Sequence, residues 1–282
     1  MKITELLPPS QDFFTNYHEK INIGKKFIQS QKIVFVGLAR NIEHQIEHSV
    51  KRLVKIGESA QEYKIIIFEN DSEDNTKSIL EHLRSVNSNI ITIHDKYNRP
   101  QFGPVQDTER TMALAEYRNI LKEYVRNQLP DYDFVIVSDM DFIDFSDDGC
   151  YNSFGWLALH SNSIDAVAGN SFEYKHVTTT EKKSLWNYDS WAFRYTWWNQ
   201  LQTLDCITFS SMLWFGFFIM PVGSTIISVN SAFGGMTIYK TQQFIQGQYD
   251  GFDCEHVCFH YNLKQTIPSF QLVLNPSQIM LV

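Results

Sequence analysis

Short apolar runs alternate with amphipathic stretches through the first half of the chain. The apolar runs are rich in Ile and Val, which is typical of buried strands in a parallel sheet. Between them, apolar residues return at helical spacing, as Ile42, Ile46 and Val50 do. This alternation predicts an α/β fold with a mostly parallel central sheet, flanking helices and right-handed crossovers. Strands are expected at residues 32–40, 63–68, 90–93 and 134–137, and helices around 42–57, 79–83 and 108–128.

The pattern changes after residue 141. Residues 173–229 show no regular period and are rich in aromatic side chains. Further on, Gly234 and Gly235 form a turn that enters either a strand or a helix. Regular elements are expected at 150–160 (a helix), 166–172 (a strand) and 267–282 (strand-like runs).

A chain of 282 residues is long enough for one large α/β domain. We predict a lead-in of residues 1–30, with one helix near residues 11–20, followed by a single domain of residues 31–282. The change of pattern divides this domain into two halves, residues 31–141 and residues 142–282.

The composition is that of a globular protein, with 43% hydrophobic and 20% charged residues. The net charge of −8 argues against a broad nucleic-acid-binding face, which needs clustered Lys and Arg. Aromatic residues reach 14%, and many fall between Trp186 and Phe218. Such a surplus suits contacts with sugar rings or with another protein, although a bulky core also produces it.

Four cysteines in a chain of this length do not make a disulfide framework, so a reducing, cytoplasmic location is expected. The polar N-terminus, with Pro8 and Pro9, is no signal peptide. The longest apolar run, residues 212–222, is too short to span a bilayer. We expect it to form a buried strand; the alternatives are that it lies against a membrane surface as a peripheral contact or lines a pocket.

Two carboxylates follow the fourth predicted strand. Asp139 and Asp141 are spaced i, i+2, so alternation along an extended chain places them on the same face. Open α/β sheets bind their ligands at the carboxyl ends of the strands. Paired carboxylates at that edge suit Mg²⁺ or Mn²⁺, which also takes phosphate oxygens. An ordinary turn after a strand is the alternative, because Asp is common there.

The glycine-rich phosphate-binding motifs are missing, since neither G-x-G-x-x-G nor G-x-x-x-x-G-K-[ST] occurs in the sequence. Phosphate charge would therefore be met by a metal ion and by arginines. Arg110 and Arg118 lie about two helical turns apart and can face a common side. A solvated helix face is the alternative for each of them.

Four motifs occur in a set order: Gly37-Leu38-Ala39-Arg40-Asn41, Glu69-Asn70-Asp71-Ser72-x-Asp74-x-Thr76, Arg110-x₃-Leu114-Ala115-x₂-Arg118-Asn119 and Asp139-Met140-Asp141. Over residues 32–265 the sequence resembles glycosyltransferases of the GT-A, Rossmann-like fold. Among these it is most similar to the fungal capsule-associated α-1,3-mannosyltransferase-like family.

The resemblance implies a nucleotide-sugar donor, a GDP- or UDP-sugar, bound in the half formed by residues 31–141. Glu69 and Asp71 would lie near the base and ribose, and Arg118 near the diphosphate or the sugar. Arg40 and Arg110 would join them on the donor side. Asp139 and Asp141 would hold Mn²⁺ or Mg²⁺, one of them through water, and Asp141 would also be catalytic. The family leans to GDP-mannose and to retention of the anomeric configuration.

The half formed by residues 142–282 would bind the acceptor, a glycan or another hydroxyl compound. Asp189, Trp191 and Arg194 mix an aromatic ring with opposite charges, which suits sugar recognition. A buried aromatic patch with a structural Asp–Arg pair explains them equally well. Phe233, Gly234 and Gly235 resemble the Gly-Gly turn that brings backbone close to the donor sugar in these enzymes.

The segment Cys254-Glu255-His256-Val257-Cys258-Phe259-His260 is dense in potential ligands. Its spacing is not that of a zinc site, and ligands two apart on one strand could not surround one ion. By resemblance, Glu255 takes the catalytic acidic place near the acceptor, and His256 or His260 approaches the metal or the diphosphate. A core position is the alternative for each histidine.

Other classes fit less well. A haloacid dehalogenase-type phosphatase carries D-x-D after its first strand, and here the motif follows the fourth. A sugar-phosphate nucleotidyltransferase would need a glycine-rich basic loop after the first strand, where this chain has Gly37-Leu38-Ala39-Arg40. A non-catalytic carbohydrate-binding protein on the same scaffold remains open. We therefore predict a metal-dependent glycosyltransferase. The family resemblance favours mannose as the sugar that is transferred.

Overall fold

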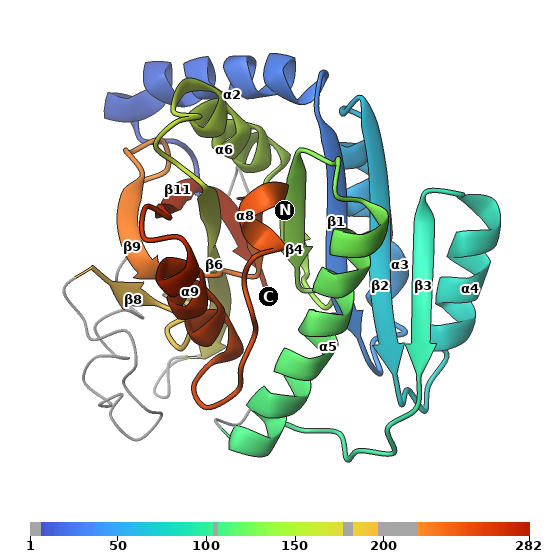
Figure 1. Cartoon of the computed structure of the whole chain (residues 1–282). Coiled ribbons are helices and arrows are strands. Elements are labelled where there is room, and N and C mark those ends of the chain that lie inside the picture. Colours follow the sequence, from blue (N-terminus) through green and yellow to red (C-terminus); the bar gives the residue numbers. More distant parts are fainter. Residues whose placement is uncertain (1–6, 104–106, 177–182, 197–218) are drawn as a thin grey trace.

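A computed structural model of the chain describes residues 7–103, 107–176, 183–196 and 219–282. Its centre is an 11-stranded sheet in the described part of the chain, with the order β3-β2-β1-β4-β10-β6-β11-β9-β8 (Figure 1). Two short strands lie off this path, because β5 pairs with β11 and β7 pairs with β6. The strands are β1 Lys32–Ala39, β2 Glu62–Asn70, β3 Ile90–Asp95, β4 Phe134–Ser138, β5 Asp144–Phe145, β6 Ala166–His176, β7 Lys183–Asn187, β8 Arg194–Tyr195, β9 Ile227–Ser231, β10 Met236–Lys240 and β11 Leu272–Leu281.

The first four strands in this order are parallel, as the alternation of strand and helix predicts. Beyond them the sheet is mixed, because β10 runs antiparallel to both β4 and β6, whereas β6 and β11 are parallel. The predicted α/β class with a central sheet and flanking helices is confirmed. The division of the domain at residue 141 stays a prediction.

The helices cover both faces of the sheet, so that alternate strand residues enter different cores. Ile33 and Phe35 of β1 pack into one core, and Val34 and Val36 pack into the other. In Figure 1, α5 and α9 lie in front of the sheet and α3 lies behind it. The helices are η1 Gln11–Phe13, α2 Phe14–Ile28, α3 Ile46–Gly57, α4 Thr76–Val86, α5 Thr108–Gln128, α6 Asp147–Leu159, α8 Thr241–Phe244 and α9 Glu255–Thr266.

Helix α2 is longer than the helix expected near residues 11–20, and it crosses α6 closely. A Cβ atom on Gly24 would lie 1.7 Å from the carbonyl oxygen of Tyr151, and one on Gly155 would lie 2.1 Å from that of Lys20. Tyr17 of α2 is buried in the core. The two glycines therefore let two helix backbones meet, which a larger side chain would prevent.

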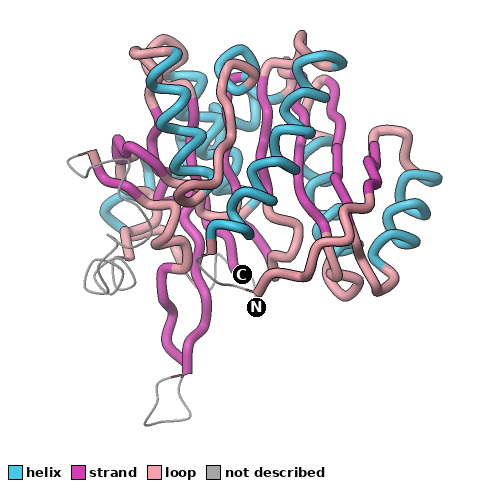
Figure 2. Tube along the Cα trace, turned by 60° about the horizontal axis from the view of Figure 1, so that its bottom comes forward, coloured by secondary structure: helices cyan, strands magenta, loops and turns pink. Residues whose placement is uncertain are grey.

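Two sequence expectations are corrected in the second half. Residues 173–229 were expected to be irregular, but β7, β8 and β9 lie in the described part of this range, and Figure 2 shows the β6–β7 hairpin extending from the body. The ligand-dense segment was treated as a strand, yet it forms the first turns of α9. The Gly-Gly turn enters a strand, β10.

Among the described residues, no helix is long and apolar enough to cross a membrane. Most of the apolar run 212–222 lies outside them.

Candidate functional site

A cavity of about 570 Å³ opens at the carboxyl ends of β1 and β4. The N-terminal half of α5, the segment 188–191 and the first turn of α9 form its other walls. This is the edge at which open α/β sheets bind ligands. Ten of the predicted site residues line the cavity: Arg40, Arg110, Arg118, Asp139, Asp141, Asp189, Trp191, Phe233, Glu255 and His256.

Arg118 of α5 is buried at the centre of this group. Its Nε atom donates a hydrogen bond to Glu255 Oε1 at 3.0 Å, and its Nη2 atom lies 3.5 Å from Asp139 Oδ1. The guanidinium also lies 5.3 Å from the centre of the Phe233 ring. Burial acts to lower the pKa of Arg118, but the charges of Glu255 and Asp139 outweigh it and raise the pKa. Arg118 is therefore a fixed cation between two acidic residues.

Asp139 and Asp141 differ in exposure, although they follow the same strand. Asp141 is exposed, whereas Asp139 lies deeper in the cavity. Burial, together with the nearby charge of Asp141, raises the pKa of Asp139 to about 8 even with Arg118 close by. The charges of Asp189 and Glu255 also act to raise the pKa of Asp139, and several carboxylates close together favour a divalent cation with oxygen ligands. The pair fits Mn²⁺ or Mg²⁺ in this respect.

The described residues contain no cluster of three or more His, Cys, Asp or Glu side chains arranged to hold a metal ion. A cation at Asp139 and Asp141 would therefore need further oxygen ligands from a bound molecule or from water. Ions such as Mg²⁺ commonly combine one or two carboxylates with substrate phosphates and water. The carboxylates of Asp139 and Asp141 are consistent with that mode of metal binding.

The two histidines of α9 have different surroundings. His256 lines the cavity and stacks on Phe233, with ring centres 3.7 Å apart. Burial holds its pKa well below the usual value, so the ring is neutral, the form that binds metals. His260 lies away from the cavity lining, and its ring nitrogens bond to Ser231 Oγ at 2.8 Å and Tyr239 Oη at 2.7 Å. Both nitrogens are occupied, so we drop His260 from the candidate metal ligands.

The predicted acceptor residues also separate into two groups. Trp191 lines the cavity, and the guanidinium of Arg110 lies 5.5 Å from its ring centre. Arg194 is buried elsewhere and pairs with both oxygens of Asp253, at 3.1 Å and 3.2 Å. It also donates to the carbonyl oxygens of Trp191 and Phe193. The alternative of a structural Asp–Arg pair is thus correct in kind, but Asp253 is the partner and not Asp189.

Glu69 and Asp71 do not line the main cavity. They face a neighbouring hollow of about 410 Å³, and Arg40 lines both this hollow and the main cavity. Asp71, with φ of +54°, accepts backbone N–H bonds from residues 97, 98 and 99. Arg40 donates to the carbonyl oxygens of Arg99 and Pro100 at 2.7 Å and 2.9 Å. These residues therefore anchor the loop after β3 beside the cavity.

Several cavity residues were missed by the sequence analysis: Asn70, Gln101, Phe102, Tyr117, Met140, Tyr188 and Cys254. Five of these residues are next to a predicted site residue in the sequence, and that position could have identified them: Asn70, Tyr117, Met140, Tyr188 and Cys254. Gln101 offers no such signal. It reaches the cavity because the Asn41 side chain, 60 residues away in sequence, bonds to it.

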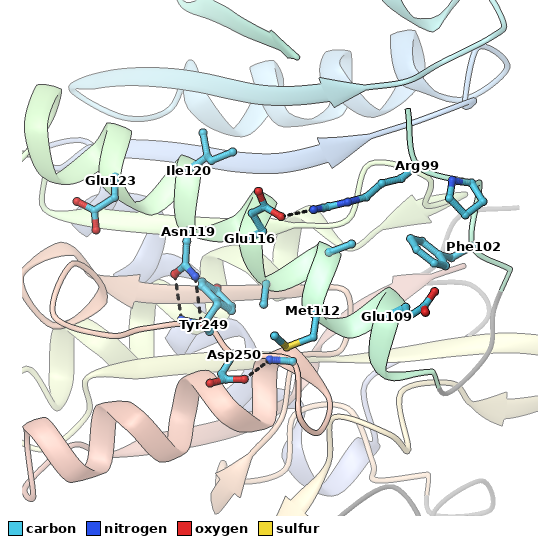
Figure 3. A pocket seen from close by; sticks show the side chains of 14 residues that line it. Arg99, Phe102, Glu109, Met112, Glu116, Asn119, Ile120, Glu123, Tyr249 and Asp250 are labelled. Carbon is cyan, nitrogen blue, oxygen red and sulfur yellow. Dashed lines mark hydrogen bonds and ion pairs between the residues drawn. The ribbon is translucent and has the colours of Figure 1, made fainter. Parts of the chain in front are cut away.

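A larger hollow of about 940 Å³ lies on the outer side of α5, and Figure 3 shows it from close by. Glu116 there is paired with Arg99, and the Asn119 amide bonds both backbone groups of Tyr249 at 3.0 Å. None of the predicted site residues lines this hollow. We therefore locate the candidate site by its chemistry and not by cavity size.

No protein-family model matches the sequence, and no curated protein matches it either. Solved structures match in fold. The mannosyltransferase PcManGT from Pyrobaculum calidifontis, in complex with GDP-Man and Mn²⁺, superposes with a TM-score of 0.50 and 11% identity, over 96% of this chain and 65% of that one. GalNAc-T7 with UDP, GalNAc and Mn²⁺ gives a TM-score of 0.56 at 10% identity, over 98% and 53%.

A third structure, S. aureus TarS 1–349 in complex with UDP-GlcNAc, gives a TM-score of 0.50 at 13% identity, over 89% of this chain and 58% of that one. The chain has the GT-A fold. It spans between 53% and 65% of the length of these three chains. At such identities the likeness establishes the fold, and the chemistry has to be argued from the cavity.

Proposed function

We propose that this protein is a metal-dependent glycosyltransferase that moves a sugar from a nucleotide-diphosphate sugar to a hydroxyl acceptor. One observation carries the proposal. Asp139, which follows β4, Arg118 of α5 and Glu255 of α9 meet in one cavity at the ligand-binding edge of a GT-A sheet. Enzymes that transfer sugars need acidic groups near the sugar carbon and positive charge near the leaving diphosphate.

In this proposal Asp139 and Asp141 hold the metal ion together with phosphate oxygens of the donor or water, and His256 lines the cavity near the diphosphate. The ion would act as a Lewis acid that stabilises the charge on the departing diphosphate. Arg110 and Arg40 supply further positive charge at the cavity wall. Glu255, at the N-terminus of α9, faces the same space, and Trp191 offers a ring for the acceptor sugar.

The donor we would test first is GDP-mannose. Support comes from the resemblance of the sequence motifs to the capsule-associated mannosyltransferase-like family and from the GDP-Man complex of the fold neighbour. UDP-sugars come next, because two other fold neighbours were solved with UDP or UDP-GlcNAc. A glycan acceptor and a cytoplasmic location also belong to the proposal. Among the described residues, Cys150, Cys254 and Cys258 are free and buried.

A panel of GDP- and UDP-sugars, each with Mn²⁺ or with EDTA, tests the proposal. Binding is read as thermal stabilisation, and turnover as released nucleoside diphosphate. A donor at about 100 times its Kd should stabilise the fold by about 2.7 kcal/mol. We expect release only with metal, and none from Asp141→Asn, whose exposed side chain makes it a mild change. Metal-dependent binding with no turnover on any acceptor would favour the carbohydrate-binding alternative.

A further inference from the structure

The turn between β9 and β10 connects a carboxylate of the cavity to the backbone of Asp139. The N–H of Gly234 donates a hydrogen bond to Asp189 Oδ2 at 2.7 Å. The carbonyl oxygen of Gly235 accepts one from the N–H of Asp139 at 2.9 Å. Asp189 therefore binds the first residue of this two-residue turn, and the second residue of the turn binds the backbone of Asp139.

This turn requires glycine at both positions. Gly234 and Gly235 have φ values of +59° and +71°, a region that side-chain-bearing residues rarely adopt. A Cβ atom on Gly234 would lie 2.2 Å from the carbonyl oxygen of Gly169, and one on Gly235 would lie 2.3 Å from Met280 Sδ. The turn therefore packs closely against β6 and β11.

Asp139 depends on this turn because it lies just beyond the regular part of β4. The antiparallel register of β10 and β4 ends at the pair Met236 and Ser138. The bond from the Asp139 N–H to Gly235 extends the ladder by one step. The Asp139 side chain is otherwise restrained by Arg118, at the longer distance of 3.5 Å.

Asp189 also contacts a second backbone N–H group. Its other oxygen, Oδ1, accepts the N–H of Ala192 at 3.4 Å. The residues that follow are fixed by Arg194, which donates to Trp191 and Phe193 and pairs with Asp253. A carboxylate can accept a hydrogen bond at each oxygen, whereas an amide offers one oxygen and a donor group. The site therefore needs an acid at residue 189.

We propose that Asp189 is a positioning residue, which fixes the Gly234–Gly235 turn and through it orients Asp139 toward the metal ion. The inference rests on the proposed role of Asp139 and Asp141 in metal binding. It replaces the expectation that Asp189 mainly contacts the acceptor. Residues that orient metal ligands in this way typically change metal affinity about 10- to 100-fold when they are substituted.

Asp189→Asn in the full chain tests the inference with two measurements. The first is Mn²⁺ affinity, from the EPR signal of free Mn²⁺, alone and with added GDP or UDP. We expect binding weaker by about 10- to 100-fold and a changed spectrum of the bound ion. The second is hydrogen exchange at the Asp139 amide by NMR. We expect this amide to exchange faster in the variant, because its acceptor is no longer fixed.

The matched control is Asp165→Asn. Asp165 also accepts a backbone N–H, that of Gln271 at 3.0 Å, and it binds Lys240 at 3.1 Å, away from the cavity. The Asp165→Asn substitution should leave Mn²⁺ affinity and exchange at the Asp139 amide unchanged, even if it lowers the stability of the fold. Should Asp189→Asn fail to fold, Asp189→Glu carries the same test, since it keeps the charge and displaces the oxygens. An unchanged Asp139 amide, or Mn²⁺ affinity within twofold of wild type, would overturn the inference. A wild-type protein that binds no Mn²⁺ would instead refute the metal-dependent function, and the exchange measurement would still test the turn.

Discussion

Arg118 and Glu255 form a buried ion pair across the candidate site, although 137 residues separate them in sequence. Their side chains are only 7% and 5% exposed. A buried charge that loses its partner is costly, because it keeps the desolvation penalty without the attraction. The pair therefore ties α5 to α9 and fixes the wall of the cavity.

We expect Arg118→Met to lower the free energy of unfolding by about 3 to 5 kcal/mol, because Glu255 is left buried and unpaired. The double variant Arg118→Met/Glu255→Gln should lose less than the sum of the two single variants. Urea denaturation of all four proteins gives this coupling energy.

An exposed pair on the same helix serves as the control. Arg126 and Glu123 are 41% and 44% exposed at 2.8 Å, so the same cycle on them should give at most about 1 kcal/mol. Equal coupling energies for both pairs would mean that Arg118 and Glu255 are not a buried pair in solution.

Glu255→Gln should report on the stereochemistry of transfer. If the product anomer is inverted, Glu255 is the general base, and its loss should lower kcat by about 10²- to 10⁴-fold with donor binding kept. If the anomer is retained, no separate base is needed, and the main effect should be a higher acceptor KM. Proton NMR of the product, together with the kinetics, separates the two. Wild-type kcat and KM in this variant would remove Glu255 from the site.

Asp71→Asn should loosen the loop after β3 without disturbing the strand before it. Asn tolerates the positive φ at this position, so the change removes charge and acceptor strength and leaves backbone preference alone. Amides of residues 97–99 should exchange faster with solvent, and donor KM should rise because Arg40 bonds to the same loop. Hydrogen exchange read by mass spectrometry is the measurement. Unchanged exchange at 97–99 would show that the loop is held by other contacts.

His260 should make the protein sensitive to acid. Burial lowers the pKa of His260 to about 3, below its usual value of 6.5. Between these values the unfolded chain binds the extra proton, so stability is complete above about pH 6.5 and falls as the pH drops toward 3. The slope from this residue is at most about 1.4 kcal/mol per pH unit.

Urea midpoints at pH 7, 6, 5 and 4 should therefore fall less steeply in His260→Gln than in wild type. His44→Gln is the control, since the His44 side chain is 91% exposed. Parallel curves for wild type and His260→Gln would contradict a neutral, buried ring.

The D-x-D pair was accessible from sequence because strand, acidic residues and spacing are all local. Arg118 and Glu255 were found through resemblance, but their direct pairing was not, since nothing local links α5 to α9. His260 was misjudged for a different reason. As a strand, the segment would present its histidines at the edge of a site. As helix α9, it turns His260 toward Ser231 and Tyr239 in the core.

Asp71 shows a second limit of sequence reasoning. Its carboxylate follows β2, where a ligand contact was expected, yet its partners are backbone N–H groups that every residue except proline carries. Such backbone donors leave no mark in the sequence of the loop. The strands and helices of the first half were predicted from the periodicity of apolar side chains, and the structure confirms them.

The close crossing of α2 and α6 has a consequence for folding during synthesis. The Asn152 side chain of α6 bonds to the Tyr17 carbonyl of α2 across 135 residues of sequence. At about 5 to 20 residues per second, a ribosome needs roughly 7 to 27 s to make that stretch. For this time the face of α2 that packs on α6 is not yet covered by it. Until α6 has been made, the face of α2 that packs on it is a natural point for chaperone contact.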